Sequence, residues 1–383
     1  MIFELTEEQL EFQKSMREFA LKELAPGALQ RDIDGDFSEV YDILMNKMGS
    51  KGLLGLTFPK EYGGLGKSYM EFALGMFELC RIDVSVGASW SVCLSLGTIP
   101  LYRFGTEEQK QKYLVPLARG EKLCAFGLTE REAGSDVSVM KTTAVRSGDK
   151  YIINGHKIYI TNAGYADTYI IFAKTDESKG SRGISAFILE KGTPGFSFGE
   201  EYNKMGIRSS IQRELIFEDV CVPVENRIGE EGEGFKIAMT ALDVGRLGVA
   251  AQGVGAAWGA YDIALEHAKN RVQFGKPITA NQAVSFKLAE MATSIELSKL
   301  ITLKAAYLLS KGLPFSKEVA MAKLVATDTA MKVTTEAVQI LGGKGYLVEN
   351  QAERFMRDAK ILQIYEGTNE IQKLVIAGYI LKE

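Results

Sequence analysis

The residues best suited to chemistry lie near the C-terminus, in the stretch Tyr365-Glu366-Gly367-Thr368-Asn369-Glu370. Glu366 places a carboxylate between an aromatic ring and a glycine, and Gly367 lets a ligand come close to the backbone because it has no side chain. Apolar surroundings would desolvate this carboxylate and raise its pKa above the usual value of about 4.3, which suits a general base. The alternative is a glutamate in a turn that caps a final helix.

Two clusters that contain glycine offer backbone N–H groups to an anion or a polar ring edge. The first covers residues 127–136, and the second covers residues 339–346, with glycines at 342, 343 and 345. An ordinary surface turn explains the first cluster equally well, and a helix that ends at a glycine explains the second. No G-x-G-x-x-G follows a strand and no P-loop sequence occurs, so neither a Rossmann nor a P-loop nucleotide site is predicted.

Arg271 precedes a turn formed by Gln273, Phe274 and Gly275. A guanidinium group at such a place can bind phosphate through two N–H groups. The alternative is a surface arginine that stabilises a helix C-terminus.

Composition excludes several classes of protein. The chain has 383 residues, 46% of them apolar and 25% charged, which is typical of a globular protein with two or three domains. The net charge of −4 shows no basic surplus, so a nucleic-acid surface is not predicted. No secretory signal and no membrane-spanning helix are expected. Four scattered cysteines fit a cytoplasmic location, and two isolated histidines argue against a metal site.

Hydrophobic periodicity divides the chain into three parts. Residues 1–123 predict an all-helical domain that starts with a capping box at Thr6 and Gln9. Residues 124–233 contain short β-rich runs between turns, which predicts an antiparallel barrel or sandwich. Residues 234–383 predict a four-helix bundle. The helices are expected at 40–51, 69–81, 85–102, 107–119, 235–269, 281–311, 316–341 and 367–381, and strands at 142–145, 151–153, 169–173, 184–189 and 214–217.

Together these parts and motifs resemble the acyl-CoA dehydrogenase family, the flavoenzymes of fatty-acid and amino-acid oxidation. The resemblance covers essentially the whole chain, in the order helical domain, β domain, bundle. It implies an α+β fold, FAD as cofactor, an acyl-CoA substrate, an electron-transfer flavoprotein as electron acceptor, and a homo-oligomer, usually a tetramer. Residues 127–136 match the first family signature, and the second is matched by Gln339, Gly342, Gly343, Gly345, Tyr346, Glu349, Arg354 and Asp358.

The resemblance assigns the catalytic base to Glu366, which would remove the α-proton of the acyl thioester. Some branched-chain members place the base just before an arginine on the first bundle helix, but here Gly245 precedes Arg246 and has no acidic group. In the family, the backbone N–H of the base residue and a flavin hydroxyl hold the thioester carbonyl.

The same resemblance implies the remaining site residues. Those that would contact FAD are Phe126, Leu128, Thr129, Ser135, Tyr159, Thr161 and Thr368, with Arg271, Phe274, Gln339 and Gly343 acting across a subunit boundary. Those that would contact the substrate are Ser135, Asp243, Arg246, Tyr365 and Gly367.

Substrate choice is expected to depend on residues 85–97, which would line the acyl pocket. Gly87 stands where glutaryl-type members carry an arginine, so a dicarboxylic substrate is disfavoured. Trp90 either shortens the pocket or belongs to the core. The expected substrate is a short-chain, branched or alicyclic acyl-CoA.

Several other functions are compatible with parts of this pattern. An enoyl-CoA reductase would run the same chemistry in reverse. A desulfinase of this fold would lack the base at Glu366, and an oxidase would be longer. A DNA-associated relative would need a basic extra region, and a helical structural protein would not explain the two glycine signatures.

Overall fold

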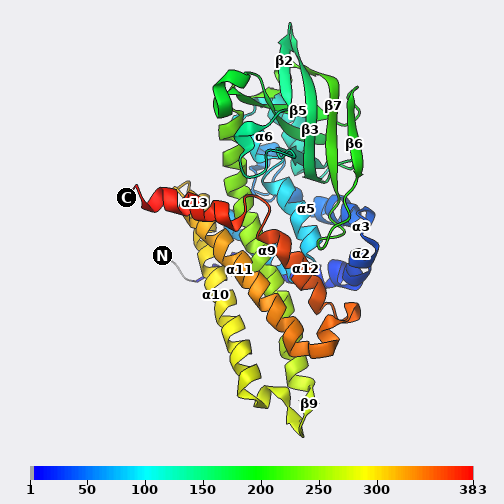
Figure 1. Cartoon of the computed structure of the whole chain (residues 1–383), viewed down its shortest axis with the longest axis vertical. Coiled ribbons are helices and arrows are strands. Elements are labelled where there is room, and N and C mark those ends of the chain that lie inside the picture. The colour runs from blue at the N-terminus through cyan, green and yellow to red at the C-terminus, as the bar shows by residue number, and fades with distance from the viewer. Residues whose placement is uncertain (1–3, 383) are drawn as a thin grey trace.

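The computed structural model describes residues 4–382 of the chain, so the first three residues of the opening segment lie outside the described part. Figure 1 shows a β region at one end of an elongated molecule, a helical layer beneath it, and long helices that run to the opposite end.

The N-terminal helical region starts at the predicted capping box. Thr6 Oγ1 accepts from Gln9 N at 3.2 Å, and the Gln9 side chain accepts from Thr6 N at 3.1 Å. These bonds satisfy N–H groups that a helix start leaves free. The helices of this region are α1 (Glu7–Phe19), α2 (Ala28–Asp34), α3 (Ser38–Asp42), α4 (Tyr69–Cys80), α5 (Val84–Leu94), α6 (Ile99–Phe104), α7 (Glu107–Gln109) and α8 (Val115–Ala118).

The helix predicted over 85–102 is interrupted, and this prediction was wrong in its length. α5 ends at Leu94, where Ser95 leaves the helical region with φ −133° and ψ −83°. α6 starts at Ile99 with Pro100 in its first turn, a position that needs no N–H donor. The stretch Val84–Phe104 is the one helical segment of residues 4–382 long and apolar enough to cross a membrane, and its most apolar 18 residues are buried in the fold.

The β region is one eight-stranded sheet with the order β6-β7-β3-β2-β4-β5-β8, and β1 pairs with β4. Most neighbours are antiparallel, but β1 and β2 each pair with β4 in parallel. The sheet is therefore mixed, whereas the sequence predicted a purely antiparallel one. Two parallel strands cannot be joined by a short hairpin, so each of these pairs is joined by a long crossover. The strands are β1 (Cys124–Gly127), β2 (Thr143–Ser147), β3 (Lys150–Thr161), β4 (Thr168–Lys174), β5 (Ile184–Glu190), β6 (Phe196–Glu201), β7 (Gln212–Pro223) and β8 (Arg227–Ile228).

The C-terminal helices are built around α9, which packs against α4, α10 and α11. The helix predicted over 367–381 is α13, which packs on α11 and extends outward (Figure 1). A helix that was not predicted, α12, packs against both α9 and α11. A hairpin of β9 (Val272–Gln273) and β10 (Lys276–Pro277) follows α9. The helices are α9 (Gly234–Asn270), α10 (Gln282–Ser310), α11 (Ser316–Leu341), α12 (Ala352–Leu362) and α13 (Asn369–Ile380).

Candidate active site

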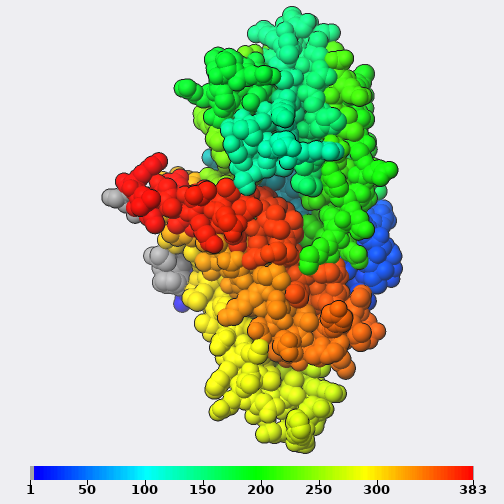
Figure 2. All heavy atoms as spheres, viewed as in Figure 1, coloured from blue at the N-terminus to red at the C-terminus, as the bar shows by residue number. Residues whose placement is uncertain are grey.

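A cavity of about 1010 Å³ lies where the β region meets α5, α9, α12 and the segment before α13. Figure 2 shows the surface hollowed between the β region and the C-terminal segment in red. Most of the predicted site residues come together on its wall although they are far apart in sequence. These residues are Phe126, Leu128, Thr129, Ser135, Tyr159, Thr161, Arg246, Tyr365, Glu366, Gly367 and Thr368.

Glu366 lies in the short turn between α12 and α13 and has a positive φ of 54°. Gly367 follows it with φ 89°, a conformation that glycine adopts without a steric cost. The N-cap of α13 is Thr368, whose side chain accepts from Ile371 N at 3.3 Å, so Glu366 is not needed as a cap. A strained non-glycine residue of this kind is typical of a functional site.

The Glu366 carboxylate is buried against α9. Its Oε2 has no hydrogen-bond partner among the described residues. A Cβ atom at Gly245 would lie only 2.1 Å from this oxygen, so the glycine leaves the space that the carboxylate occupies. Burial raises the pKa of Glu366 to about 8, although the charges of Arg246 and Lys323 pull it down. A carboxyl group with this pKa can both take up and release a proton near neutral pH.

Arg246 contacts the backbone of the same turn. Its Nε donates to the Glu366 carbonyl oxygen at 3.4 Å, and its Nη1 pairs with Asp243 Oδ1 at 2.7 Å. Asp243 in turn accepts from Ser316 Oγ at 2.5 Å and is not part of the cavity wall. The structure therefore places Asp243 behind Arg246, where it orients the guanidinium group.

One side of the cavity is closed by a polar pair. The Tyr365 hydroxyl donates to Gln252 Oε1, and Gln252 is only 1% exposed. Gln252 follows Gly245 by seven residues on α9, a distance of about 10 Å along a helix axis. The apolar wall beside it comes from Ala88, Val92 and Leu96. Sequence reasoning did not identify Gln252, because one glutamine on an Ala- and Gly-rich helix gives no signal by itself.

Two residues of the predicted acyl pocket lie elsewhere. Trp90 is fully buried, and its Nε1 donates to the Leu53 carbonyl oxygen at 2.9 Å, which makes it a core residue. Gly87 is not on the cavity wall, and a Cβ atom there would lie 2.2 Å from Cys80 Sγ.

The first glycine cluster forms the β side of the cavity, and a buried ion pair holds it. Lys157 Nζ lies 2.7 Å from Glu130 Oε1, and this lysine side chain is fully buried. Glu130 also accepts from Lys141 N at 2.5 Å and from Thr142 N at 3.1 Å. The carboxylate therefore organises the turn that carries Leu128, Thr129 and Ser135. It satisfies two backbone donors at once, and the one at Thr142 is buried.

Tyr159 stands at an irregular place in β3 and is the exposed ring of this wall. Its φ is 61°, it is 60% exposed, and the register of β3 against β7 shifts between Lys157 and Ile160. A bulge of this type turns a side chain out of the strand alternation. Thr161 lies nearby and accepts a hydrogen bond from Gln212 Nε2 at 3.2 Å.

Four predicted residues lie away from this cavity. Arg271 and Phe274 belong to the β9–β10 hairpin at the far end of the long helices (Figure 1). Phe274 is 98% exposed. Gln339 lies near the end of α11, and Gly343 lies just beyond it. None of the four lines the cavity of its own chain, so their predicted role depends on a neighbouring subunit.

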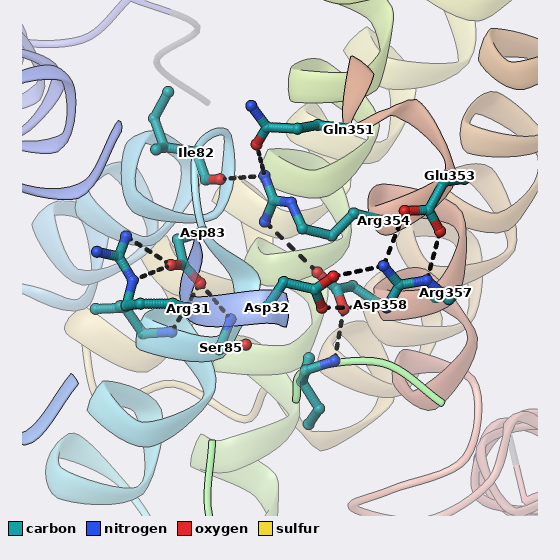
Figure 3. A network of polar contacts seen from close by, with 12 residues as sticks. Arg31, Asp32, Ile82, Asp83, Ser85, Gln351, Glu353, Arg354, Arg357 and Asp358 are labelled. Atoms are coloured by element: carbon teal, nitrogen blue, oxygen red, sulfur yellow. Dashed lines mark hydrogen bonds and ion pairs between the residues drawn. The ribbon is translucent and has the colours of Figure 1, made fainter. Parts of the chain in front are cut away.

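A network of ion pairs fixes α12, the helix that leads into Glu366 (Figure 3). Arg357 Nη2 lies 2.5 Å from Asp32 Oδ2, and Arg357 Nε lies 2.5 Å from Glu353 Oε2. Arg354 Nη2 donates to the Ile82 carbonyl oxygen at 2.8 Å. Arg354 and the buried Asp358 belong to the second signature, so the structure gives that signature a role in anchoring α12.

Asp358 links α12 to the loop before β7. Its Oδ1 accepts from Ile207 N, and burial raises the pKa of Asp358 to about 7 against the opposing charge of Arg354. Ile207 has φ 44°, which is strained for a β-branched residue. Gly206 and Ile207 line the cavity. The same network therefore holds both the helix before Glu366 and one part of the cavity wall.

Comparison with known proteins gives one consistent result. The family model for the acyl-CoA dehydrogenase N-terminal domain matches residues 6–121, the middle-domain model matches 125–220, and the C-terminal-domain model matches 232–381. The "Acyl-CoA dehydrogenase, short-chain specific" of Megasphaera elsdenii is 51% identical, with 100% of both chains covered.

Solved structures agree in fold over the full length. Butyryl-CoA dehydrogenase from Megasphaera elsdenii has a TM-score of 0.96 and 50% identity, with 100% of both chains covered. A chain described under "Electron transferring flavoprotein of Acidaminococcus fermentans: Towards a mechanism of flavin-based electron bifurcation" has a TM-score of 0.97 and 52% identity, again with 100% of both chains covered. The predicted resemblance and three-part fold are confirmed, and this chain belongs to the acyl-CoA dehydrogenase family.

Proposed function

We propose that this protein dehydrogenates a short-chain acyl-CoA between Cα and Cβ, with FAD as its bound cofactor and an electron-transfer flavoprotein as the next electron acceptor. The observation that carries the proposal is the Glu366 carboxylate. It faces the large cavity, its Oε2 has no partner, and its pKa is raised to about 8 by burial. A base in this state is suited to the weakly acidic α-proton of a thioester.

A short acyl chain is supported by the cavity wall and by the relatives. Gln252 and Tyr365 pair on the cavity wall, with Gln252 about two helical turns from Gly245, and we infer that this pair limits the acyl chain to a few carbon atoms beyond Glu366. The names of the similar proteins, "short-chain specific" acyl-CoA dehydrogenase and butyryl-CoA dehydrogenase, point to the same class. Ala88, Val92 and Leu96 are apolar, so this part of the described wall offers a distal carboxylate no cation of its own.

The cavity residues suit a flavin dinucleotide. The cavity is large, Tyr159 offers an exposed aromatic face, and the hydroxyl groups of Thr129, Ser135, Thr161 and Thr368 line the same space. These residues would hold FAD, and the hairpin residues of a neighbouring copy would complete its site in an oligomer. When bound, FAD supplies the acceptor for the hydride from Cβ.

The protein itself positions the substrate and moves one proton. Glu366 takes the α-proton, and its backbone N–H donates to the thioester carbonyl oxygen, where negative charge develops, as the family resemblance implies. The apolar wall excludes water, which strengthens that hydrogen bond. Arg246 orients the turn through the Glu366 carbonyl group. Alignment of the base with the Cα–Cβ bond is the main requirement.

Anaerobic titration of the purified flavoprotein with butyryl-, hexanoyl-, octanoyl- and isobutyryl-CoA tests the proposal. We expect loss of the oxidised flavin absorbance with the shorter substrates. Glu366→Gln should keep the bound flavin and lose nearly all of this bleaching. Unchanged bleaching in the variant would remove Glu366 from the mechanism, and bleaching only by long chains would refute the short-chain assignment.

The reverse reaction, reduction of an enoyl-CoA, is the second candidate. The raised pKa of Glu366 favours it, because a carboxyl group with a pKa of about 8 is largely protonated at neutral pH and can return a proton to Cα. Rapid reoxidation of the reduced enzyme by crotonyl-CoA would support this direction. The ratio of the two rates would identify the preferred one.

A further inference from the structure

Lys323 is a buried cation next to the turn that carries Glu366. It lies on α11, and its side chain is fully buried. Its Nζ donates to the Gly367 carbonyl oxygen at 2.9 Å and to Asn369 Oδ1 at 2.8 Å. Among the ion pairs of residues 4–382, none joins this nitrogen to a carboxylate. Burial of an ammonium group is costly unless hydrogen bonds compensate it, and this ammonium group makes its hydrogen bonds to the turn beside Glu366 and to the start of α13.

The Glu366–Gly367 turn has a strained backbone, and hydrogen bonds to the Gly367 carbonyl oxygen hold it. Glu366 and Gly367 both have positive φ, at 54° and 89°. The Gly367 carbonyl oxygen accepts from Lys323 and also from Gln372 Nε2, at 2.8 Å. A strained residue such as Glu366 keeps its conformation only when its surroundings hold it, at a cost of roughly 1–3 kcal/mol. Lys323 provides one of the two hydrogen bonds that fix this peptide group.

The lysine is itself held in place. Asn369 Nδ2 donates to Asp328 Oδ1 at 2.8 Å, so its Oδ1 faces the opposite way and accepts from Lys323. Thr327 Oγ1 also contacts Asn369, at 3.0 Å. The α11 helix and the start of α13 are therefore joined at the point where the ammonium group meets the turn.

We propose that Lys323 is a positioning residue of the dehydrogenation, which fixes the Glu366–Gly367 turn through the Gly367 carbonyl group and favours the ionised form of Glu366 through its charge. The inference rests on the function proposed above. It assigns a role to a residue that does not line the cavity and that the sequence did not single out.

The charges around Lys323 and Glu366 determine whether removal of Lys323 raises or lowers the pKa of Glu366. Arg246 on α9 also faces Glu366, while Asp328 on α11 and Glu370 on α13 face Lys323. Burial lowers the pKa of Lys323 to about 7, against the pull of Glu366. The positive charge of Lys323 lowers the pKa of Glu366, so removal of that charge should raise it further.

Two substitutions separate the hydrogen bond from the charge. Lys323→Met removes both, and we expect kcat to fall by about 100-fold with KM nearly unchanged, because misplacement of about 1 Å has that effect. The acid limb of the pH profile should move upward, because the charge of Lys323 lowers the pKa of Glu366. Lys323→Gln keeps a donor without the charge, so it should recover part of kcat but not the position of the acid limb.

The control is Lys332→Met, which removes the same charge from α11 at a side chain that is 59% exposed and 4.0 Å from Glu290. It should behave like the wild type. Flavin content and melting temperature are recorded for each variant. A measurement without turnover accompanies them: proton uptake on binding crotonyl-CoA, measured by calorimetry in buffers of different ionisation enthalpy, reports the pKa of Glu366.

The outcomes separate this inference from the proposed function. If the wild type is not reduced by any acyl-CoA, the proposed function fails. If the wild type is active and Lys323→Met keeps kcat within about threefold with an unshifted acid limb, only the role of Lys323 is refuted. If the methionine variant does not fold, the glutamine variant decides, and an acid limb at the wild-type position overturns the inference.

Discussion

Truncation of Gln252 should lengthen the preferred substrate. Gln252 and Tyr365 form the polar pair at the closed side of the cavity, and Gln252 is 1% exposed. Gln252→Ala deletes four heavy atoms at that position. Because protein interiors collapse only partly around a deletion, we expect space for about two additional methylene groups.

The size of the change in chain-length preference follows from the transfer of two methylene groups of the substrate out of water. Each buried methylene contributes about 0.8 kcal/mol, so two contribute about 1.6 kcal/mol. Since about 1.4 kcal/mol corresponds to a tenfold change, the kcat/KM ratio of hexanoyl-CoA to butyryl-CoA should rise roughly 15-fold. Loss of the acceptor leaves the Tyr365 hydroxyl unpaired, which should destabilise the protein by about 1–3 kcal/mol.

The assay is single-turnover flavin reduction with butyryl-, hexanoyl- and octanoyl-CoA under anaerobic conditions. Gln252→Leu is the matched control, because it also leaves the Tyr365 hydroxyl without an acceptor but fills most of the space. It should lose similar stability and keep the wild-type chain-length ratio. If the alanine and leucine variants show the same ratio, Gln252 does not limit the acyl chain and the reasoning fails.

Three further outcomes are expected. The folded-state pKa of Glu366 is raised to about 8 from 4.5, so the folded protein binds more protons than the unfolded chain between these values and loses stability as pH rises through them. Glu366→Gln should therefore be more stable than the wild type at pH 9, by about 5 kcal/mol at about 1.4 kcal/mol for each pH unit between the two values, and similar to it at pH 4.5, in urea unfolding at both pH values. Arg357→Met should lower the free energy of unfolding by about 3 kcal/mol, because it leaves the carboxylate of Asp32 without its ion-pair partner, whereas Arg357→Lys should lose less. Removal of FAD should lower the melting temperature, since a ligand at 1,000 times its Kd stabilises a protein by about 4 kcal/mol, and return of FAD should restore it.

Local patterns predicted much of the fold. The strands β4 and β5 are continuous apolar runs that are buried on both faces, and the sequence indicated both. The capping box at Thr6 and the long helices α9, α10 and α11 were also indicated by the sequence. These features depend on residues close in sequence, so one chain is enough to recognise them.

The elements that sequence reasoning missed depend on distant partners. α12 was missed although its apolar residues Ala352, Phe355, Ala359 and Leu362 recur at helical spacing, and its buried face also carries the charged residues Arg354 and Asp358. Arg354 donates to the backbone carbonyl oxygen of Ile82, and Asp358 accepts from the backbone N–H of Ile207. Both of these backbone partners are distant in sequence. The parallel pairing of β1 with β4 is equally invisible in a local pattern.

In the candidate site, too, some residues could be recognised from the sequence and others depend on partners that are distant in sequence. The Tyr365–Thr368 motif and the first glycine cluster were recognised through a family resemblance, and the structure places both on one cavity. Gln252 and Lys323 had no such signal. Their contacts, with the Tyr365 hydroxyl and the Gly367 carbonyl group, exist only after α9 and α11 pack beside the turn.

The reactivity of Glu366 depends on several segments of the fold together. The space for its carboxylate comes from Gly245 on α9, the hold on its turn comes from Lys323 on α11, and α12 is anchored to the N-terminal region through Asp32. Burial is the first cause of its raised pKa, so a substitution that loosens any of these contacts admits water and lowers that pKa toward 4.5. Loss of stability near the turn should therefore shift the pH profile as well as reduce the rate, whereas destabilisation in the distant β9–β10 hairpin should leave the profile of the remaining folded enzyme unchanged.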